Sequence, residues 1–175
     1  MMQVRAPRDE DFPAIARITN HYITTTTIHF AYEPVADGEL LAQWQRYRET
    51  FPWLVLADGD AVLGYAKAGT WRERAAYRWT AEVGLYLADG ERGRGLGRLL
   101  YGALLDELAR RKFHSVVAGI ALPNDASIGL HRALGFASVG VVEDAGWKNG
   151  TWHSVEFWQK RLAPRDEPPP TAGAS

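Results

Sequence analysis

A glycine-rich segment between an apolar run and an amphipathic run constrains the fold of this chain more than any other stretch. It reads RGRGLG at residues 92–97, follows the apolar run 83–87 and precedes the amphipathic run 98–111. This order predicts a strand, a turn and a helix. Glycine lets the main chain approach a ligand closely, and the first turn of a helix offers unpaired N–H groups to an anion. Because two arginines add positive charge, the segment predicts a cradle for a pyrophosphate.

Two better-known phosphate-binding loops do not fit these letters. The nucleotide-triphosphate loop requires Gly-x4-Gly-Lys-Ser/Thr, and no such lysine follows the glycines. The dinucleotide fingerprint Gly-x-Gly-x-x-Gly fails from Gly93, where it would end on Arg98, and from Gly95, where it would end on Leu100. A glycine-rich turn that binds nothing is the alternative, and the arginines and the helix start favour the anion site.

Composition restricts the classes of protein to consider. The 175 residues, with 46% hydrophobic and 23% charged, are typical of one globular domain with a substantial core. A net charge of −1 gives no general attraction to nucleic acid or to an anionic membrane, so we expect neither as a partner. The absence of cysteine excludes disulfides and a thiol nucleophile, and it suits a cytoplasmic location. We find neither an N-terminal signal core nor an apolar run of the ~20 residues needed to cross a bilayer.

Hydrophobic periodicity and turn residues predict an α/β fold with a mixed, mostly antiparallel sheet flanked by helices. Helices are expected at residues 7–25, 36–50, 98–111 and 125–134. Strands are expected at residues 4–6, 51–57, 61–71, 77–87, 115–121, 138–145 and 152–161, with hairpin turns at 58–60 and 148–150. The crossover from strand 77–87 through helix 98–111 to strand 115–121 predicts a central, right-handed parallel βαβ unit.

All of these elements are assigned to one domain over residues 1–162, because the sequence shows no internal repeat and no second domain. Residues 163–175 are rich in proline and small polar residues, which predicts a disordered tail. Within the domain, the helix after the glycine-rich segment should bury one apolar stripe. Its members are Leu96, Leu99, Leu100, Ala103, Leu104 and Leu108.

Two motifs resemble the GNAT superfamily of N-acetyltransferases. Arg92-x-x-Gly95-x-Gly97 is similar to its acetyl-CoA pyrophosphate loop, and Asn124-x-x-Ser127-x-x-x-His131 followed by Leu134-Gly135-Phe136 is similar to its closing helix. Within the superfamily, the chain most resembles the phosphinothricin acetyltransferases and their methionine sulfoximine-acetylating relatives. The shared segments, spread over residues 2–162, are Asn20-His21-Tyr22, Phe51-Pro52-Trp53-Leu54-Val55, Tyr77-x-Trp79-Thr80-x-Glu82, Leu122-Pro123-Asn124-Asp125, His131-x-Ala133-Leu134-Gly135 and Gly150-x-Trp152-His153.

The resemblance implies acetyl-CoA as the co-substrate and assigns residues to each part of it. The main chain of Leu85, Tyr86 and Leu87 would pair with the pantetheine arm, and Asn124 would lie near the thioester. The pyrophosphate would be held by the glycine-rich segment and the residue after it, namely Arg92, Gly93, Arg94, Gly95, Leu96, Gly97 and Arg98. The amino-acid substrate would contact Phe30, Arg72, Arg74 and Tyr77.

The resemblance also implies that Glu82 and His131 transfer protons. An acceptor amine must be neutral to attack a thioester, and amino groups titrate at about 8 or above, so a base is needed. Glu82 lies among apolar strand residues, which would raise its pKa, although an ion pair with Arg72 or Arg74 is the alternative. Most of the superfamily has tyrosine at the position of His131, where it protonates the leaving thiolate. A hydrogen-bonded structural histidine is the alternative for His131.

The implied activity is direct transfer of acetyl from acetyl-CoA to the α-amino group of phosphinothricin, methionine sulfoximine or methionine sulfone, with a role in detoxification. Two alternatives remain open: an acetyltransferase of the same fold for another amine, such as a protein N-terminus, and a non-catalytic CoA-binding module. The histidines show no metal-ligand spacing, so no metal is expected. Apolar hairpin surfaces near Trp147 and Trp152 predict a homodimer.

Overall fold

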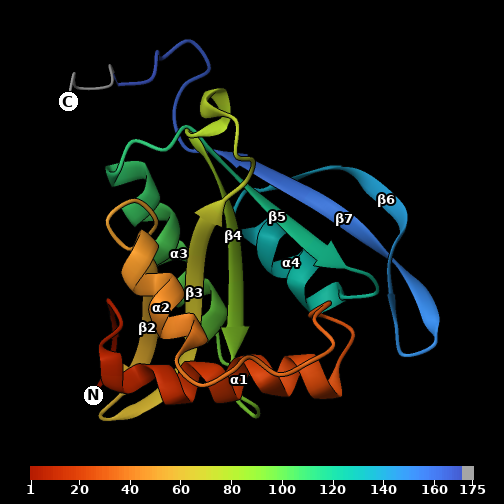
Figure 1. Ribbon diagram of the computed structural model, residues 1–175. Coiled ribbons are helices and arrows are strands. Elements are labelled where there is room, and N and C mark those ends of the chain that lie inside the picture. Colours follow the sequence, from red (N-terminus) through yellow and green to blue (C-terminus); the bar gives the residue numbers. More distant parts are fainter. Residues whose placement is uncertain (171–175) are drawn as a thin grey trace.

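The computed structural model describes residues 1–170, which form a seven-stranded sheet with helices on both faces (Figure 1). The strands are β1 (Met2–Arg5), β2 (Trp53–Asp58), β3 (Ala61–Thr70), β4 (Thr80–Leu87), β5 (Ser115–Ala121), β6 (Ala137–Lys148) and β7 (Thr151–Arg161). The helices are α1 (Phe12–Thr25), α2 (Glu39–Tyr47), α3 (Leu96–Arg110) and α4 (Asp125–Ala133), with short 3-10 helices at Asp9–Asp11 and Ala75–Tyr77. None of the helices in this part of the chain is long and apolar enough to span a membrane.

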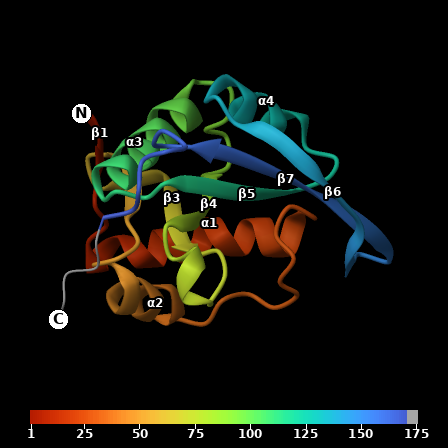
Figure 2. The same cartoon turned by 90° about the horizontal axis from the view of Figure 1, so that it is seen from above.

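The strands are ordered β1-β2-β3-β4-β5-β7-β6, and every neighbouring pair is antiparallel except β4 and β5. The predicted α/β fold, with a mostly antiparallel sheet and a central parallel unit, is therefore confirmed. Figure 2 shows α1 and α2 on one face of the sheet and α3 and α4 on the other.

Each face of the sheet has its own apolar core. On the α1 side, Phe12 and Trp44 pack with Trp53, and the ring of Tyr65 stacks beyond them. On the α3 side, Leu100 and other leucines of that helix are completely buried against the inner strands. Burial of one such side chain contributes roughly 1.5–3 kcal/mol, so the two cores hold the inner strands in place.

Helix α3 starts two residues earlier than predicted, because Gly95 caps it in the left-handed conformation with φ 75° and ψ 0°. Its buried stripe is also rotated from the predicted one. Leu99 is 53% exposed, which makes that part of the prediction wrong, whereas Tyr101 and Leu105 are buried. The sequence pattern could not show the rotation, because leucines occur on both sides of the helix.

Two other predicted elements begin too early, and in each case a short turn intervenes. The predicted helix 7–25 begins only at Phe12, after the 3-10 helix Asp9–Asp11. The Asp11 carboxylate accepts a hydrogen bond from the Arg8 N–H at 2.7 Å. The predicted strand 77–87 begins only at Thr80, after the 3-10 helix Ala75–Tyr77. Helix 36–50 is likewise shorter at both ends.

The predicted disordered tail lies partly outside the described residues. Residues 163–170 contain no helix or strand, and residues 171–175 are not described. The disorder of this tail therefore stays a prediction.

The pairing of β4 with β5 is unusually short. It covers three residue pairs, from Thr80 opposite Ser115 to Glu82 opposite Val117, although both strands continue beyond that point. Past Glu82, β4 pairs only with β3, and β5 pairs only with β7. The sheet therefore opens between its two central strands, as Figure 1 shows.

A nearly buried ion pair ties β1 to the start of α1, and we predict that it makes stability depend on pH. Arg5 donates two hydrogen bonds to the Asp11 carboxylate, at 2.6 and 2.9 Å, and this contact holds the pKa of Asp11 below its ordinary value of 3.8. A depressed carboxyl pKa stabilises the fold above the unfolded pKa and ceases to do so as pH falls through the folded one. Asp11→Asn should therefore lower the free energy of unfolding by about 2 kcal/mol at neutral pH.

Chemical denaturation at several pH values measures this effect. The difference between wild type and Asp11→Asn should begin to shrink as pH falls below 3.8, where the carboxyl of the unfolded chain becomes protonated, and it should be lost as pH falls through the lower pKa of the folded carboxyl. Glu10→Gln, at an exposed acid in the same turn, should change stability by less than about 0.5 kcal/mol at any of these pH values. An Asp11 effect that stays constant with pH would show that the charge is not its source.

Candidate functional site

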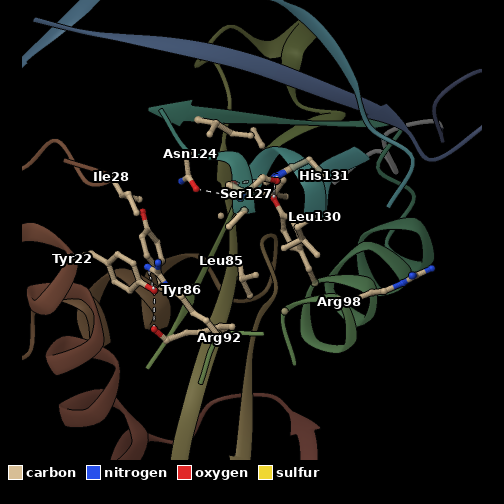
Figure 3. A pocket seen from close by; sticks show the side chains of 18 of the residues that line it. Tyr22, Ile28, Leu85, Tyr86, Arg92, Arg98, Asn124, Ser127, Leu130 and His131 are labelled. Carbon is tan, nitrogen blue, oxygen red and sulfur yellow. Dashed lines mark hydrogen bonds between the residues drawn. The ribbon is translucent and has the colours of Figure 1, made fainter. Parts of the chain in front are cut away.

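The opening between β4 and β5 holds a cleft of about 300 Å³ (Figure 3). Main-chain groups alternate sides along a strand, and the Ala88 N–H donates to the Leu63 carbonyl of β3. The N–H and C=O of Leu85 consequently point away from β3, toward the opening, where β5 no longer supplies a partner. Unpaired main-chain groups along the wall of a cleft suit a ligand that contains amide groups.

The glycine-rich segment closes one end of this cleft. Gly93 and Gly95 both have positive φ, 77° and 75°, and a Cβ on either would meet no atom within 4 Å. These two glycines therefore leave open space beside the start of α3. Gly97 differs, because a Cβ there would lie 3.2 Å from Leu85 and 3.4 Å from Leu130, so it lets the helix approach β4 and α4.

Arg92 is held at the cleft by α1. Its guanidinium donates to the Tyr22 hydroxyl at 3.1 Å and lies 5.4 Å from the centre of that ring. The Tyr22 hydroxyl in turn donates to the Leu87 carbonyl at 2.9 Å. Figure 3 shows Tyr22 and Arg92 side by side, with Arg98 extending from α3 on the other side of the cleft. The chain thus fixes one cation in a defined place before any ligand binds.

Nine of the eleven residues predicted to bind the cofactor line this cleft. They are Leu85, Tyr86, Leu87, Arg92, Gly93, Gly95, Gly97, Arg98 and Asn124. Arg94 does not line it, since its side chain is directed to Glu91 in an ion pair. Leu96 is buried in the core beneath and does not line it either. Asn124 uses its side-chain oxygen to accept the Ser127 N–H at 3.2 Å, which caps α4 and leaves its NH₂ group available.

His131 also lines the cleft, but its ring is fully engaged within the protein. Nδ1 lies 2.7 Å from the Ser127 carbonyl, so it carries the proton, and Nε2 accepts from the Tyr101 hydroxyl at 3.1 Å. Burial lowers the pKa of His131, and burial raises the pKa of Tyr101. At this wall of the cleft, a neutral His131 therefore orients the Tyr101 hydroxyl.

A second, wider cleft of about 850 Å³ lies on the other side of β4. Glu82 lines it, together with Arg72 from the β3–β4 loop and Lys67 from β3. Partial desolvation in the cleft raises the pKa of Glu82 above 4.5, and the charge of Lys67 opposes that rise. Four residues line both clefts, and they show that the two spaces adjoin where β4 leaves β5: Val83, Gly84, Tyr86 and Gly119.

The structure separates the four residues predicted to bind the amino-acid substrate. Arg72 lies in the second cleft, but Phe30, Arg74 and Tyr77 line neither cleft. Phe30 packs on Gly146 of β6, and Tyr77 is 43% exposed on its 3-10 helix. The alternative of an ion pair between Glu82 and either arginine is not observed among the salt bridges of residues 1–170. Substrate binding by Phe30, Arg74 and Tyr77 stays a prediction.

Sequence reasoning missed three residues of the site, namely Tyr22, Lys67 and Tyr101. Tyr22 and Tyr101 carried the signal of core residues, since both lie on the apolar faces of helices. Lys67 had a clearer signal, because a single lysine interrupts the small and apolar residues of β3. Among residues 1–170, no group of three or more histidine, aspartate or glutamate side chains could hold a metal ion. The absence of a resident metal stays an expectation.

Comparisons with known proteins agree with this geometry. Residues 15–136 match the model of the acetyltransferase (GNAT) family. A phosphinothricin N-acetyltransferase of Streptomyces viridochromogenes is 42% identical over 91% of this chain and 87% of its own length. An L-methionine sulfoximine/L-methionine sulfone acetyltransferase of Pseudomonas aeruginosa is 38% identical over 91% of this chain and 94% of its own.

The fold is also that of a solved relative. The structure of yncA from Salmonella typhimurium, with its cofactor acetyl-CoA, superimposes with a TM-score of 0.92 at 34% identity, covering 96% of this chain and 98% of that one. A match to the family model over most of the chain, together with relatives above 30% identity along nearly its whole length, shows the family. This chain belongs to the GNAT family of acetyltransferases.

Proposed function

We propose that this enzyme transfers the acetyl group of acetyl-CoA directly to the α-amino group of a small amino acid or analogue. Phosphinothricin, methionine sulfoximine and methionine sulfone are the proposed substrates, because relatives at 38–42% identity are named for them. The observation that carries the proposal is the pair of adjoining clefts. One has free main-chain groups and a glycine-rich end, and the other contains a carboxylate with a raised pKa.

The first cleft fits acetyl-CoA. Its diphosphate would lie on Gly93, Gly95 and the first turn of α3, where N–H groups lack helical partners. Arg92 would add a fixed positive charge. The amide groups of the pantetheine arm would pair with the main chain of Leu85, which β5 no longer contacts by hydrogen bonds. Bound there, acetyl-CoA supplies an acetyl group activated as a thioester.

The residues of the chain supply the proton transfers and the orientation. Glu82 would accept the proton of the acceptor amine, directly or through a water, since a raised pKa brings a carboxylate closer to neutrality. An N–H of β4 between Val83 and Leu87 would polarise the thioester carbonyl. At the other wall, Tyr101 and His131 form one hydrogen-bonded pair, so we propose that they handle protons together at the departing thiolate.

A panel of acceptors tests the proposed function. The purified enzyme with acetyl-CoA should release thiol with phosphinothricin, methionine sulfoximine and methionine sulfone, and much more slowly with a peptide bearing a free N-terminus. Glu82→Gln should lower kcat roughly a hundredfold or more while leaving the Kd for acetyl-CoA unchanged. Wild-type kcat/KM should fall on the acid side with a pKa above 4.5, because the carboxylate must be ionised to act.

The panel also separates the open alternatives. Faster turnover with the peptide would favour an acetyltransferase for protein N-termini. Binding of CoA with no turnover of any acceptor, and equal behaviour of wild type and Glu82→Gln, would favour a non-catalytic CoA-binding module.

The glycine cradle is tested by adding a side chain to it. Gly95→Val should weaken acetyl-CoA binding at least tenfold by calorimetry, because valine disfavours φ 75° and its side chain would enter the space left for the diphosphate. Gly59→Val provides a matched control in the β2–β3 turn, since Gly59 also has positive φ and open space around its Cβ position. Both variants lose stability, and only the Gly95 variant should lose affinity. Unchanged affinity in Gly95→Val would contradict the cradle.

We further propose a single acetyltransferase domain over residues 1–162, a cytoplasmic location, a role in detoxification and a homodimer.

The homodimer proposal rests on the β6–β7 hairpin, where β6 is an edge strand and its residues are mostly exposed. Five large apolar residues of the hairpin are about half exposed: Val139, Val141, Val142, Trp147 and Trp152. A long apolar edge strand of this kind favours pairing with a second copy.

Light scattering after gel filtration tests the homodimer. Wild type should have the mass of two chains, and Val141→Lys should shift it toward one chain, because a buried lysine at the interface would be unpaired. Leu99→Lys is the matched control, since Leu99 is an equally exposed apolar residue on α3. A monomeric wild type, or a dimer that survives Val141→Lys, would argue against this interface.

A further inference from the structure

Lys67 is a cation in the second cleft to which neither the predicted roles nor the fold gives a task. Its side chain is half-buried and lies over the Trp53 ring, with the ammonium 5.1 Å from the ring centre. Among residues 1–170, no carboxylate lies within 4 Å of it. Partly desolvated charges in proteins are normally paired. A lone ammonium lining a cleft therefore points to an anionic ligand.

The strand register places Lys67 beside Glu82. On the β3–β4 ladder, Lys67 pairs with Gly84 and Glu82 pairs with Gly69, so the two charged side chains stand on one face as diagonal neighbours. Each faces a glycine across the ladder. A Cβ at Gly69 would meet no atom within 4 Å, and one at Gly84 would meet only the Tyr86 ring, at 3.8 Å. The two charges therefore border open space.

We propose that Lys67 binds the α-carboxylate of the acceptor amino acid and so selects free amino acids over amines that lack this group. The inference rests on the proposed function. An amino acid carries its ammonium and its carboxylate on the same carbon atom, and Glu82 and Lys67 offer the complementary pair of charges side by side. With the amine at Glu82, the carboxylate would lie at Lys67, the diagonal neighbour of Glu82 on the same face of the sheet. Arg72, exposed at the rim, is left for the anionic or sulfone end of the side chain.

Electrostatics agree with this assignment. Burial lowers the pKa of Lys67, and Glu82 partly restores it. A bound carboxylate would restore it further, so the charged form of Lys67 and the amino acid stabilise each other. A peptide N-terminus has an amide in place of the carboxylate and would leave this ammonium unpaired, which costs affinity.

The test compares methionine sulfone with methionine sulfone amide, in which the carboxylate is a neutral carboxamide. In the wild type, kcat/KM should favour the acid. Lys67→Met keeps the apolar stem and removes the charge, so the acid-to-amide ratio of kcat/KM should fall roughly tenfold or more, mainly through KM of the acid. Lys67→Arg should retain most of the preference. The differing basicity of the two amines affects every variant equally and cancels from the comparison.

Binding measurements keep the result independent of turnover. By calorimetry, the Kd of methionine sulfone should rise roughly tenfold in Lys67→Met, while the Kd of acetyl-CoA stays at the wild-type value. Lys67→Gln repeats both measurements with a polar replacement, in case the methionine variant does not fold. Arg72→Met is the matched cation control, and its acid-to-amide ratio should remain that of the wild type.

The outcomes separate this inference from the proposed function. An unchanged ratio in Lys67→Met and Lys67→Gln, or equal losses for acid and amide, would overturn the role of Lys67 while the acetyltransferase activity stands. A wild-type enzyme that acetylates neither compound would overturn the proposed function and this inference with it.

Discussion

The early end of the β4–β5 pairing governs the whole site. If the two strands stayed paired to their ends, their main-chain groups would satisfy each other and no cleft would exist. Instead, pairing stops at Glu82, and beyond it β4 pairs only with β3 while β5 pairs only with β7. The free edge of β4, the start of α3 and the cap of α4 then face one space. The catalytic glutamate of the proposal stands at the point of divergence.

The positions of individual cations matter more for anion binding in this chain than its net charge. The chain has a net charge of only −1, yet four cations line the two clefts: Lys67, Arg72, Arg92 and Arg98. Arg92 is fixed by Tyr22 of α1, and Lys67 by the face of Trp53. Fixing a cation before the ligand arrives reduces the entropy lost on binding. The residues that fix these cations belong to the core on the α1 side of the sheet, so packing and recognition are coupled.

Sequence patterns predicted the elements well where periodicity and turn residues agreed. The run 115–121 was correctly read as a strand, and the hairpin turns at 58–60 and 148–150 lie where glycine and asparagine place them. Errors occurred where a local side-chain contact competes with the pattern. Asp11 accepts main-chain and arginine hydrogen bonds and so delays α1. The exposure of Leu99 depends on the rotation of α3 against the sheet, which no local pattern records.

By itself, the sequence determined the order of elements, the phosphate-type turn before α3 and the residue types available for chemistry, because these depend on short-range geometry and composition. Only the tertiary structure decided where β4 leaves β5 and that His131 is engaged by Tyr101. It also placed Glu82 and Lys67 together in a cleft separate from the glycine-rich segment. Those relations join residues that are distant along the chain. They follow from register and packing between elements, which short-range patterns do not encode.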